Sequence, residues 1–189
     1  YELEMGVLAA DSFGWPQTRK RFFMVASRKS RPVPFDDIRS AYKMPALPVT
    51  WALDGVVASP HEGDLFRSPA KLNETSRNRI RELDQAGLFD MPLHLRPDSH
   101  KLGTTYTSSY GRMRPERPAP TITTGFFTPG RGRFIHPTEL RTLTAIEAAR
   151  IQGFPNWYEF ASTPHTRTSL AKWIGDAVPS ILGYLATKS

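Results

Sequence analysis

Hydrophobic and polar residues alternate at the start of the chain, where every second residue from Tyr1 to Val7 is apolar. A period of two predicts a β-strand with one apolar face. The break Gly14-Trp15-Pro16 is typical of a turn, and the following RFFMVAS is rich in residues that suit a sheet. We therefore expect the chain to begin with a β-hairpin.

A helical spacing of apolar residues occurs in SRNRIRELDQAGLF, where Ile80, Leu83 and Leu88 fall on one stripe. Ser76 is expected to open this helix and Gly87 to close it. The Pro-punctuated residues 29–69 predict irregular structure with short elements.

Two further helical patterns lie near the C-terminus. Thr144 and Glu147 form a capping box before IEAARIQ, and Gly153 supplies a stop. The stretch SLAKWIGDAVPSILGYLATK predicts two helices that separate at Gly175, with Pro179 in the first turn of the second.

The region between these helical patterns is rich in turn formers and basic residues. Residues 91–120 are expected to form a surface excursion. The β-branched stretch APTITTGFF, residues 119–127, predicts a strand, and TPGRGR predicts a basic loop after it.

Composition narrows the possible functions only slightly. The 189 residues suffice for one domain or two small ones, and a net charge of +7 favours a polyanionic partner. The chain contains no cysteine, which excludes disulfides, Cys-ligated zinc and a cysteine nucleophile within it. The histidines show no metal-ligand spacing, so we expect no metal site; they are His61, His94, His100, His136 and His165.

A polar row precedes the second predicted strand. In an extended segment Gln17, Arg19 and Arg21 share one face, and Lys20 takes the other. Two guanidiniums beside an amide form a donor-rich patch that suits phosphate oxygens or the acceptor edge of a base. The alternative is an ordinary solvated end of a hairpin.

A second candidate patch lies in TITTGFFTPGRGRF. Thr121 and Thr123 are expected to share a strand face, where their hydroxyls can donate to phosphate oxygens. Gly130, Arg131 and Arg133 lie in the basic loop, where backbone N–H groups can also approach an anion. The alternative is a strand end with a plain loop.

A third candidate is SYGRMRPER, which places Tyr110, Arg112 and Arg114 close together. A mixture of aromatic and cationic side chains suits nucleic acid. Exposed loops also carry such mixtures without binding anything.

The blocks GWPQTRKR, RPAPTITTGF, RFIHP, RTLTAIEAARIQGFP and IGDAVP occur in this order along the chain. In wording and spacing they resemble the C-terminal half of bacterial DNA (cytosine-5)-methyltransferases. The resemblance covers almost the whole chain. The stretch between the hairpin and PTIT is similar to that family's target-recognition region.

The resemblance implies an α/β fold: the C-terminal part of an S-adenosylmethionine-dependent methyltransferase, with a β-hairpin and helices of the catalytic domain. A small, largely irregular target-recognition domain is implied beside it. The implied divisions are residues 1–30 for the catalytic hairpin, 31–136 for the recognition domain, and 137–189 for helices that return to the catalytic domain.

Enzymes of this family extrude the target cytosine from double-stranded DNA, because its reacting carbon is inaccessible inside the stack. They transfer methyl from S-adenosylmethionine to C5. The resemblance implies that Arg19 and Arg21 belong to a donor cradle for the base, with Arg21 near the ring and Arg19 orienting or bracing it. It implies for Gln17 a contact that holds the hairpin or the backbone.

The resemblance also assigns contacts away from the base. Thr121 and Thr123 match a motif at the backbone of the target strand, and the loop from Gly130 to Arg133 lies where such enzymes approach DNA; Arg112 is a further DNA-binding candidate. Gly175, Asp176, Ala177 and Val178 match the block that borders the methyl donor. The family usually has Asn where this chain has Asp176, and an ionised carboxylate cannot donate a hydrogen bond.

The family's cofactor-binding glycine motif and Pro-Cys nucleophile block would precede this hairpin and are not in the sequence. We therefore expect the chain alone to be inactive, to need an N-terminal catalytic half from the same gene or a split subunit, and to self-associate without it. The resemblance implies a cytoplasmic, nucleoid-associated bacterial enzyme of a restriction-modification system. Two alternatives are a non-enzymatic DNA-binding module derived from such an enzyme and a basic structural domain.

Overall fold

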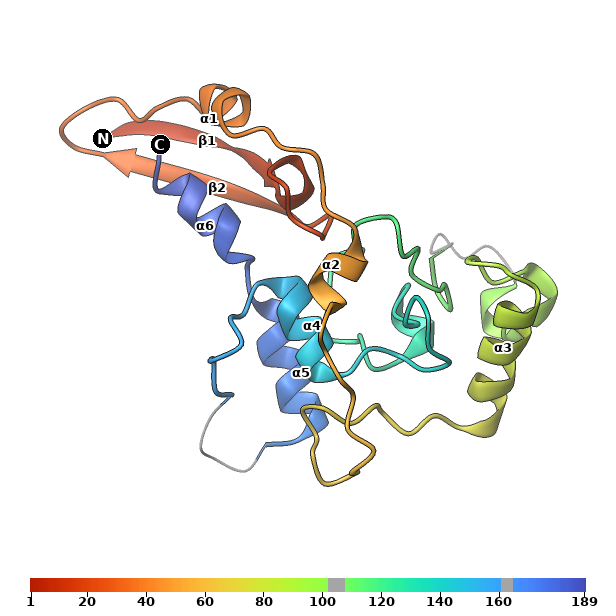
Figure 1. Cartoon of the computed structure of the whole chain (residues 1–189). Coiled ribbons are helices and arrows are strands. Elements are labelled where there is room, and N and C mark those ends of the chain that lie inside the picture. The colour runs from red at the N-terminus through yellow and green to blue at the C-terminus, as the bar shows by residue number, and fades with distance from the viewer. Residues whose placement is uncertain (102–107, 161–164) are drawn as a thin grey trace.

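The computed structural model describes residues 1–101, 108–160 and 165–189 of the chain. The predicted surface excursion therefore includes residues 102–107, which lie outside the described residues. None of the described helices is long and apolar enough to cross a membrane. The strands and α-helices, in chain order (Figure 1), are β1 Glu2–Ala9, β2 Lys20–Ser27, α1 Phe35–Ala41, α2 Val49–Leu53, α3 Glu74–Gln85, α4 Ala145–Gln152, α5 Arg167–Asp176 and α6 Ser180–Ala186. Short 3₁₀ turns are Ala10–Ser12, Leu93–Leu95, Asp98–His100 and Pro129–Arg131.

The predicted hairpin is confirmed, because β1 and β2 pair in antiparallel register with Met5 opposite Met24. One face of the hairpin is covered by α1 and α6 (Figure 1), and its apolar residues share a buried cluster with Phe35 and Leu182. The connection between the strands passes through Gly14, whose φ of +76° is readily adopted by glycine.

The other face of the hairpin is apolar and open to solvent. Its large side chains are between 47% and 63% exposed, and they are Leu3, Met5, Val7, Phe22 and Met24. We call this set the apolar hairpin face. Contiguous exposed apolar surface of this kind is typical of an interaction site.

The largest core lies around α2, α4 and α5, where α4 and α5 run side by side (Figure 1). Irregular backbone supplies much of this core, including the fully buried Ile122 and Phe126. A smaller cluster beneath α3 joins Ile80 and Leu83 to Met91 and Ile135. Part of the predicted surface excursion is therefore buried. The predicted division of the chain at residues 30 and 136 stays a prediction.

The capping box predicted for α4 is confirmed. The Thr144 side chain accepts from the N–H of Glu147, and the Glu147 carboxylate accepts from the N–H of Thr144. Gly153 ends the helix in the left-handed conformation at φ +99°. The carboxylate of Glu147 also binds Arg141 in a bidentate pair, with Nη2 2.6 Å from Oε1.

The prediction of a strand over residues 119–127 is wrong. The backbone pairs with the hairpin connection at one position, where Ala119 donates to Pro16 and accepts from Thr18. Pro120 follows and has no N–H to continue a ladder. The chain then turns over residues 124–127, so Thr121 and Thr123 are not held on one strand face.

The predicted helix at Ser76 exists but begins earlier. Asn73 is its N-cap and accepts from the N–H of Ser76, so α3 starts at Glu74. Ile80 and Leu83 are buried as expected, whereas Leu88 is exposed because the helix has already ended.

The last two helices separate later than predicted. Gly175 lies within α5, and the break falls at Ala177, which is extended at φ −60°, ψ 153°. Pro179 occupies the N-cap of α6 and therefore precedes its first turn.

The bidentate pair of Arg141 and Glu147 yields a prediction about stability. Burial alone would raise the pKa of Glu147, but the hydrogen bonds and positive charge of Arg141, with the backbone hydrogen bond from Thr144, together outweigh it and the net shift is downward. This contribution to stability is present above the ordinary carboxyl pKa and is lost as pH falls through the lowered one. Arg141→Met should lower the free energy of unfolding by about 3–5 kcal/mol, because it leaves a buried carboxylate unpaired.

The pH dependence provides a second measurement on the same variant. Without Arg141, burial should raise the pKa of Glu147, so the unfolding free energy of the variant should increase as pH is lowered from neutrality. Urea denaturation at several pH values measures both effects. Arg117→Met is the control, because Arg117 is exposed and its ion pair with Glu116, at 3.8 Å, is long and weak. Equal losses in the two variants would contradict the prediction.

Candidate nucleic-acid and cofactor site

The polar row before β2 does not form one open patch, which corrects the prediction. Gln17 and Arg19 precede the strand, and both are buried, at 0% and 2% exposure. Arg19 donates from Nη1 to the carbonyl of Ile122 at 2.7 Å and from Nη2 to that of Gly175 at 3.0 Å. Because both acceptors are backbone oxygens of other segments, Arg19 braces the site from within.

Burial of Arg19 has an electrostatic consequence. Desolvation, followed by the positive charge of Arg21, lowers the pKa of the Arg19 guanidinium to about 10, and the negative charge of Asp176 opposes this. The guanidinium remains charged at neutral pH. Arg19 and Arg21 are therefore close enough to repel each other, and Asp176 partly compensates.

Arg21 differs from Arg19 in its surroundings. It lies within β2, is partly exposed, and donates from Nη1 to the carbonyl of Lys20 at 2.7 Å. No carboxylate within the described ranges forms an ion pair with it. Of the two predicted cradle arginines, Arg21 is the one whose donors are available to a ligand.

The predicted cofactor edge lies where α5 ends. Asp176 and Ala177 line a cavity of about 520 Å³, and the side chain of Asp176 accepts from Lys172 at 2.9 Å. The remaining walls of this cavity are mostly aromatic, formed by Phe154, Tyr158, Phe160 and Trp173. Sequence reasoning missed this wall, although the aromatic residues are concentrated in FPNWYEF just after the α4 stop.

The other two predicted cofactor residues have different environments. Val178 is exposed and does not line the cavity. Gly175 is buried against the backbone of Thr123 and Thr124, where a Cβ atom would lie 2.4 Å from the Thr124 nitrogen. Only glycine allows α5 and this segment to approach so closely.

A hydroxyl-rich cavity of about 660 Å³ brings together three predicted DNA-binding residues, Thr123, Gly130 and Arg131. Thr121 is not among its lining residues. The cavity also contains Ser109, Thr124 and Thr128, which sequence reasoning missed although threonine is frequent in TITTGFFT. Hydroxyls around one exposed arginine are suited to phosphate oxygens.

Glycines shape this cavity. A Cβ at Gly125 would lie 2.7 Å from the Cβ of Arg131, and one at Gly130 would lie 2.8 Å from the Tyr110 hydroxyl. Tyr110 itself has a φ of +59°, which is unusual for a bulky residue, and its N–H donates to the Pro129 carbonyl at 2.8 Å. The loop is therefore held in one shape by close packing.

Two predicted DNA-binding arginines have internal partners instead. Arg112 pairs with Asp84 at 2.5 Å, and Arg133 pairs with Asp90 and donates to the carbonyl of Phe89 at 2.8 Å. The hydrogen bond from Arg133 lowers the pKa of Asp90. Arg112 therefore holds its segment to α3, Arg133 holds the loop to the segment around residue 90, and both charges are largely neutralised.

His136, Glu139 and Glu147 lie close enough to hold a metal ion, which their spacing in the sequence did not indicate. Arg141 already binds both carboxylates, however, at 2.8 Å from Glu139 and 2.6 Å from Glu147. Burial lowers the pKa of His136, and its Nδ1 accepts from the N–H of Glu139 at 3.1 Å. The cluster is a partly buried ion-pair network at the start of α4, with Glu139 on its exposed side.

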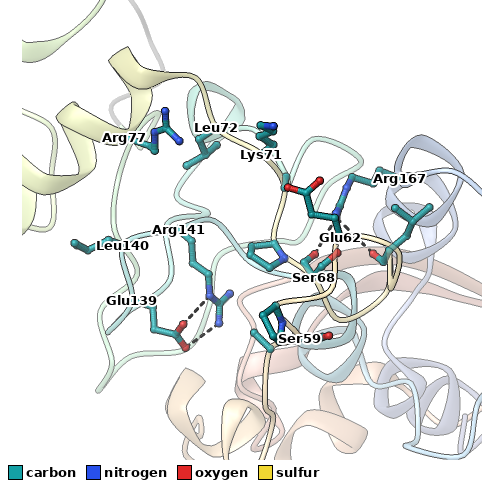
Figure 2. Close-up of a pocket in the computed structure, with 15 residues that line it drawn as sticks. Ser59, Glu62, Ser68, Lys71, Leu72, Arg77, Glu139, Leu140, Arg141 and Arg167 are labelled. Carbon is teal, nitrogen blue, oxygen red and sulfur yellow. Dashed lines mark hydrogen bonds and ion pairs between the residues drawn. The ribbon is translucent and has the colours of Figure 1, made fainter.

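A separate cavity of about 640 Å³ lies between residues 58–72 and Arg141 (Figure 2). Arg167 reaches across one wall and donates to the carbonyl and hydroxyl of Ser68 at 2.9 and 2.8 Å. Acidic and basic side chains both line this cavity, including Glu62 and Lys71 (Figure 2). None of the predicted site residues lies in it, and its mixed charge favours no single class of ligand.

Comparison with known proteins shows which family this chain is similar to. The family model of C-5 cytosine-specific DNA methylases matches residues 1–188. The type II methyltransferase M1.BsuMI of Bacillus subtilis (strain 168) is 39% identical over 186 residues, which cover 98% of this chain and 43% of that protein. The type II methylase M.HgiDII of Herpetosiphon aurantiacus is 32% identical over 196 residues, covering 100% of this chain and 55% of that protein.

Solved structures show the same fold. The crystal structure of the S. pombe Dnmt2 methyltransferase aligns with a TM-score of 0.64 and 16% identity, over 98% of this chain and 56% of that one. A putative DNA modification methyltransferase encoded within a prophage (E. coli) aligns with a TM-score of 0.54 and 19% identity, over 97% of this chain and 58% of that one. The chain spans about half the length of each of these four proteins.

The close approach at Gly175 predicts the effect of a single methyl group. Gly175→Ala should destabilise the chain by about 1–3 kcal/mol, because the backbone of residues 123–124 must move away from α5. Urea denaturation measures the loss. The matched control is Gly183→Ala in α6, where a Cβ meets nothing within 4 Å and should stabilise the helix by up to about 1 kcal/mol. Loss of stability in both variants, or in neither, would contradict the role of close packing.

Proposed function

Because this chain belongs to the C-5 cytosine-specific DNA methylase family, we propose that it is the DNA-recognition and cofactor-edge portion of a DNA (cytosine-5)-methyltransferase. The observation that carries this proposal is the position of Arg19. Its guanidinium joins the N-terminal end of β2 to Ile122, beside the hydroxyl-rich cavity, and to Gly175, beside the aromatic cavity. The proposed contacts to the target base, the DNA backbone and the cofactor thus share one rigid frame.

The target base would meet Arg21. Enzymes that modify a base inside DNA extrude it from the stack, and the pocket then recognises its polar edge. Arg21 is partly exposed, uses one Nη1 donor on the Lys20 carbonyl, and lies two residues beyond the buried Arg19. A guanidinium there stabilises the electron density that a pyrimidine ring gains when a nucleophile adds to it.

The DNA backbone would meet the hydroxyl-rich cavity. Phosphate contacts position a protein on DNA without reading its sequence, and threonine hydroxyls and arginine commonly make them. Thr123, Thr124 and Arg131 are exposed in this cavity. The roles of Arg112 and Arg133 in our proposal are structural, because both are paired with aspartates.

S-adenosylmethionine fits the aromatic cavity, and when bound it supplies the methyl group. Aromatic faces suit both an adenine ring and a sulfonium cation. Asp176 can accept hydrogen bonds there, and its carboxylate is held by Lys172. Ala177 borders the same space, whereas Val178 is exposed outside it.

The nucleophile of this reaction would come from outside the chain, since the sequence contains no cysteine. We propose that the N-terminal catalytic half supplies it and covers the apolar hairpin face. The relatives are about twice as long as this chain, and the exposed face consists of large apolar side chains. Without that half we expect the chain to be inactive and prone to self-association. A role in restriction-modification follows from the type II relatives.

Arg21 can be tested in the complete enzyme, assembled from this chain and its N-terminal half. Arg21→Ala should reduce incorporation of tritiated methyl into DNA by about 10²–10³-fold, because it removes a donor to the reacting ring. Binding to duplex DNA should change little. Arg28→Ala is the control, since Arg28 lies just after β2 and stacks on Tyr1 instead. If wild-type mixtures bind DNA and never methylate it, the chain is a binding module; if Arg21→Ala methylates normally, Arg21 has no role at the base.

Arg131 should act on binding. Arg131→Ala should weaken DNA binding uniformly across sequences and reduce the slope of log K against log salt by about 1, because one phosphate contact is lost. Fluorescence anisotropy over a salt series measures both quantities. The matched control is Arg81→Ala, an exposed arginine of α3 that donates to Asn78. A slope that is equal in wild type and Arg131→Ala would place the phosphate contact elsewhere.

A further inference from the structure

Two buried glutamines connect the hairpin to the cofactor edge. Gln17, in the connection before β2, donates from Nε2 to the Gln152 Oε1 at 2.9 Å and to the Ile151 carbonyl at 3.3 Å. Gln152, the last residue of α4, donates from its own Nε2 to the carbonyls of Ile174, at 2.8 Å, and Ala177. Both glutamines are fully buried.

The orientation of each amide is fixed by these contacts. Both side-chain N–H groups of Gln152 donate to backbone carbonyls, and its side-chain oxygen accepts from Gln17. Reversing its amide would place an oxygen against two carbonyl oxygens, which repel it. The Gln17 amide is fixed in the same way, because reversal would set its oxygen against those of Ile151 and Gln152.

The carbonyls that Gln152 and Arg19 bind need a partner for a specific reason. The last carbonyls of a helix have no intrahelical N–H, and α5 ends at Asp176. If the helix continued, the N–H of residue 179 would serve Gly175, but Pro179 has none. Arg19 serves the Gly175 carbonyl instead, and Gln152 serves those of Ile174 and Ala177.

We propose that Gln152 is a positioning residue for the methyl donor: through Gln17 it fixes the Asp176–Ala177 turn relative to the catalytic hairpin. This inference rests on the proposed function, because it assumes that the turn borders the donor. Gln152 does not line the aromatic cavity and acts only through backbone carbonyls. A substitution that removes the side-chain N–H groups of Gln152 leaves the carbonyls of Ile174 and Ala177 without these donors. The Asp176–Ala177 turn is then no longer connected to Gln17.

The experiment uses the complete enzyme and S-adenosylmethionine. Gln152→Met should raise the Kd for S-adenosylmethionine by about tenfold, roughly the effect of one lost hydrogen bond, and leave the Kd for DNA unchanged. Gln17→Met should act in the same direction. The double variant should be no weaker than the weaker single variant, since both substitutions interrupt one connection. Additive effects, or an unchanged Kd for S-adenosylmethionine in Gln152→Met, would overturn the inference.

Thr144→Ala is the matched control. It removes the cap at the opposite end of the same helix and should lower stability by about 1 kcal/mol. It should leave the Kd for S-adenosylmethionine unchanged. An equal rise in Kd in Thr144→Ala would mean that general loosening of α4 explains the effect, and the inference would fail. If Gln152→Met does not fold, Gln17→Met carries the test, because it interrupts the same connection and leaves the carbonyls of Ile174 and Ala177 with their Gln152 donors.

Hydrogen exchange separates this inference from the proposed function. Without any ligand, peptides covering residues 174–182 should exchange faster in Gln152→Met than in wild type or Thr144→Ala. Faster exchange with no S-adenosylmethionine binding by wild type would support the positioning of the turn and refute the cofactor assignment. Normal exchange in Gln152→Met, with wild type binding the donor, would refute the inference and leave the proposed function standing.

Discussion

The rest of the site depends on one buried side chain, Arg19. Its guanidinium donates one hydrogen bond to the carbonyl of Ile122 and another to that of Gly175. It places a charge inside the molecule with neutral acceptors, and the lowered pKa of Arg19 shows the desolvation cost. Packing of an apolar side chain would avoid that cost, but it could not satisfy the Gly175 carbonyl, which Pro179 leaves without a helical donor. Because the guanidinium is planar and its donors are fixed in direction, it also sets the distance between the two segments. The interaction therefore provides geometry more than stability.

The arginines of this chain divide into those with internal partners and those without, and the division decides which can act on a ligand. Arg112 and Arg133 hold aspartates, and Arg141 holds two glutamates, so their charges are neutralised within the fold. Arg21 and Arg131 have no ion pair with a described carboxylate. The 25 Lys and Arg residues therefore overstate the breadth of any basic surface, because several of them pair with carboxylates inside the fold, a cancellation that the net charge of +7 already includes. A polyanion would be attracted to a few positions, set by the frame around Arg19.

Local rules predicted the local structure well. The capping box of Thr144 and the helix end at Gly153 could be predicted because each depends on residues within one helical turn. The hairpin could be predicted from the period of two in its apolar residues. The prediction of a strand at residues 119–127 is wrong for two reasons. Pro120 has no N–H to continue a ladder, and a strand also needs a neighbouring strand, which a local pattern does not supply. Alternation also suggested an open face for Gln17 and Arg19; their burial depends on carbonyls more than a hundred residues away. The aromatic wall and the hydroxyl-rich cavity are likewise products of tertiary packing.

The hairpin has one covered face and one exposed face, and this contrast bears on how the proposed N-terminal half would bind. Its inner face belongs to a buried cluster that α1 and α6 close, while the apolar hairpin face, including Phe22 and Met24, stays exposed. The buried cluster with α1 and α6 fixes the inner face independently of whatever covers the outer one. A second half that covers the outer face would therefore meet a surface already in its final shape. Association would then cost little ordering of this chain, so a larger share of the free energy gained from the buried apolar area would remain as affinity.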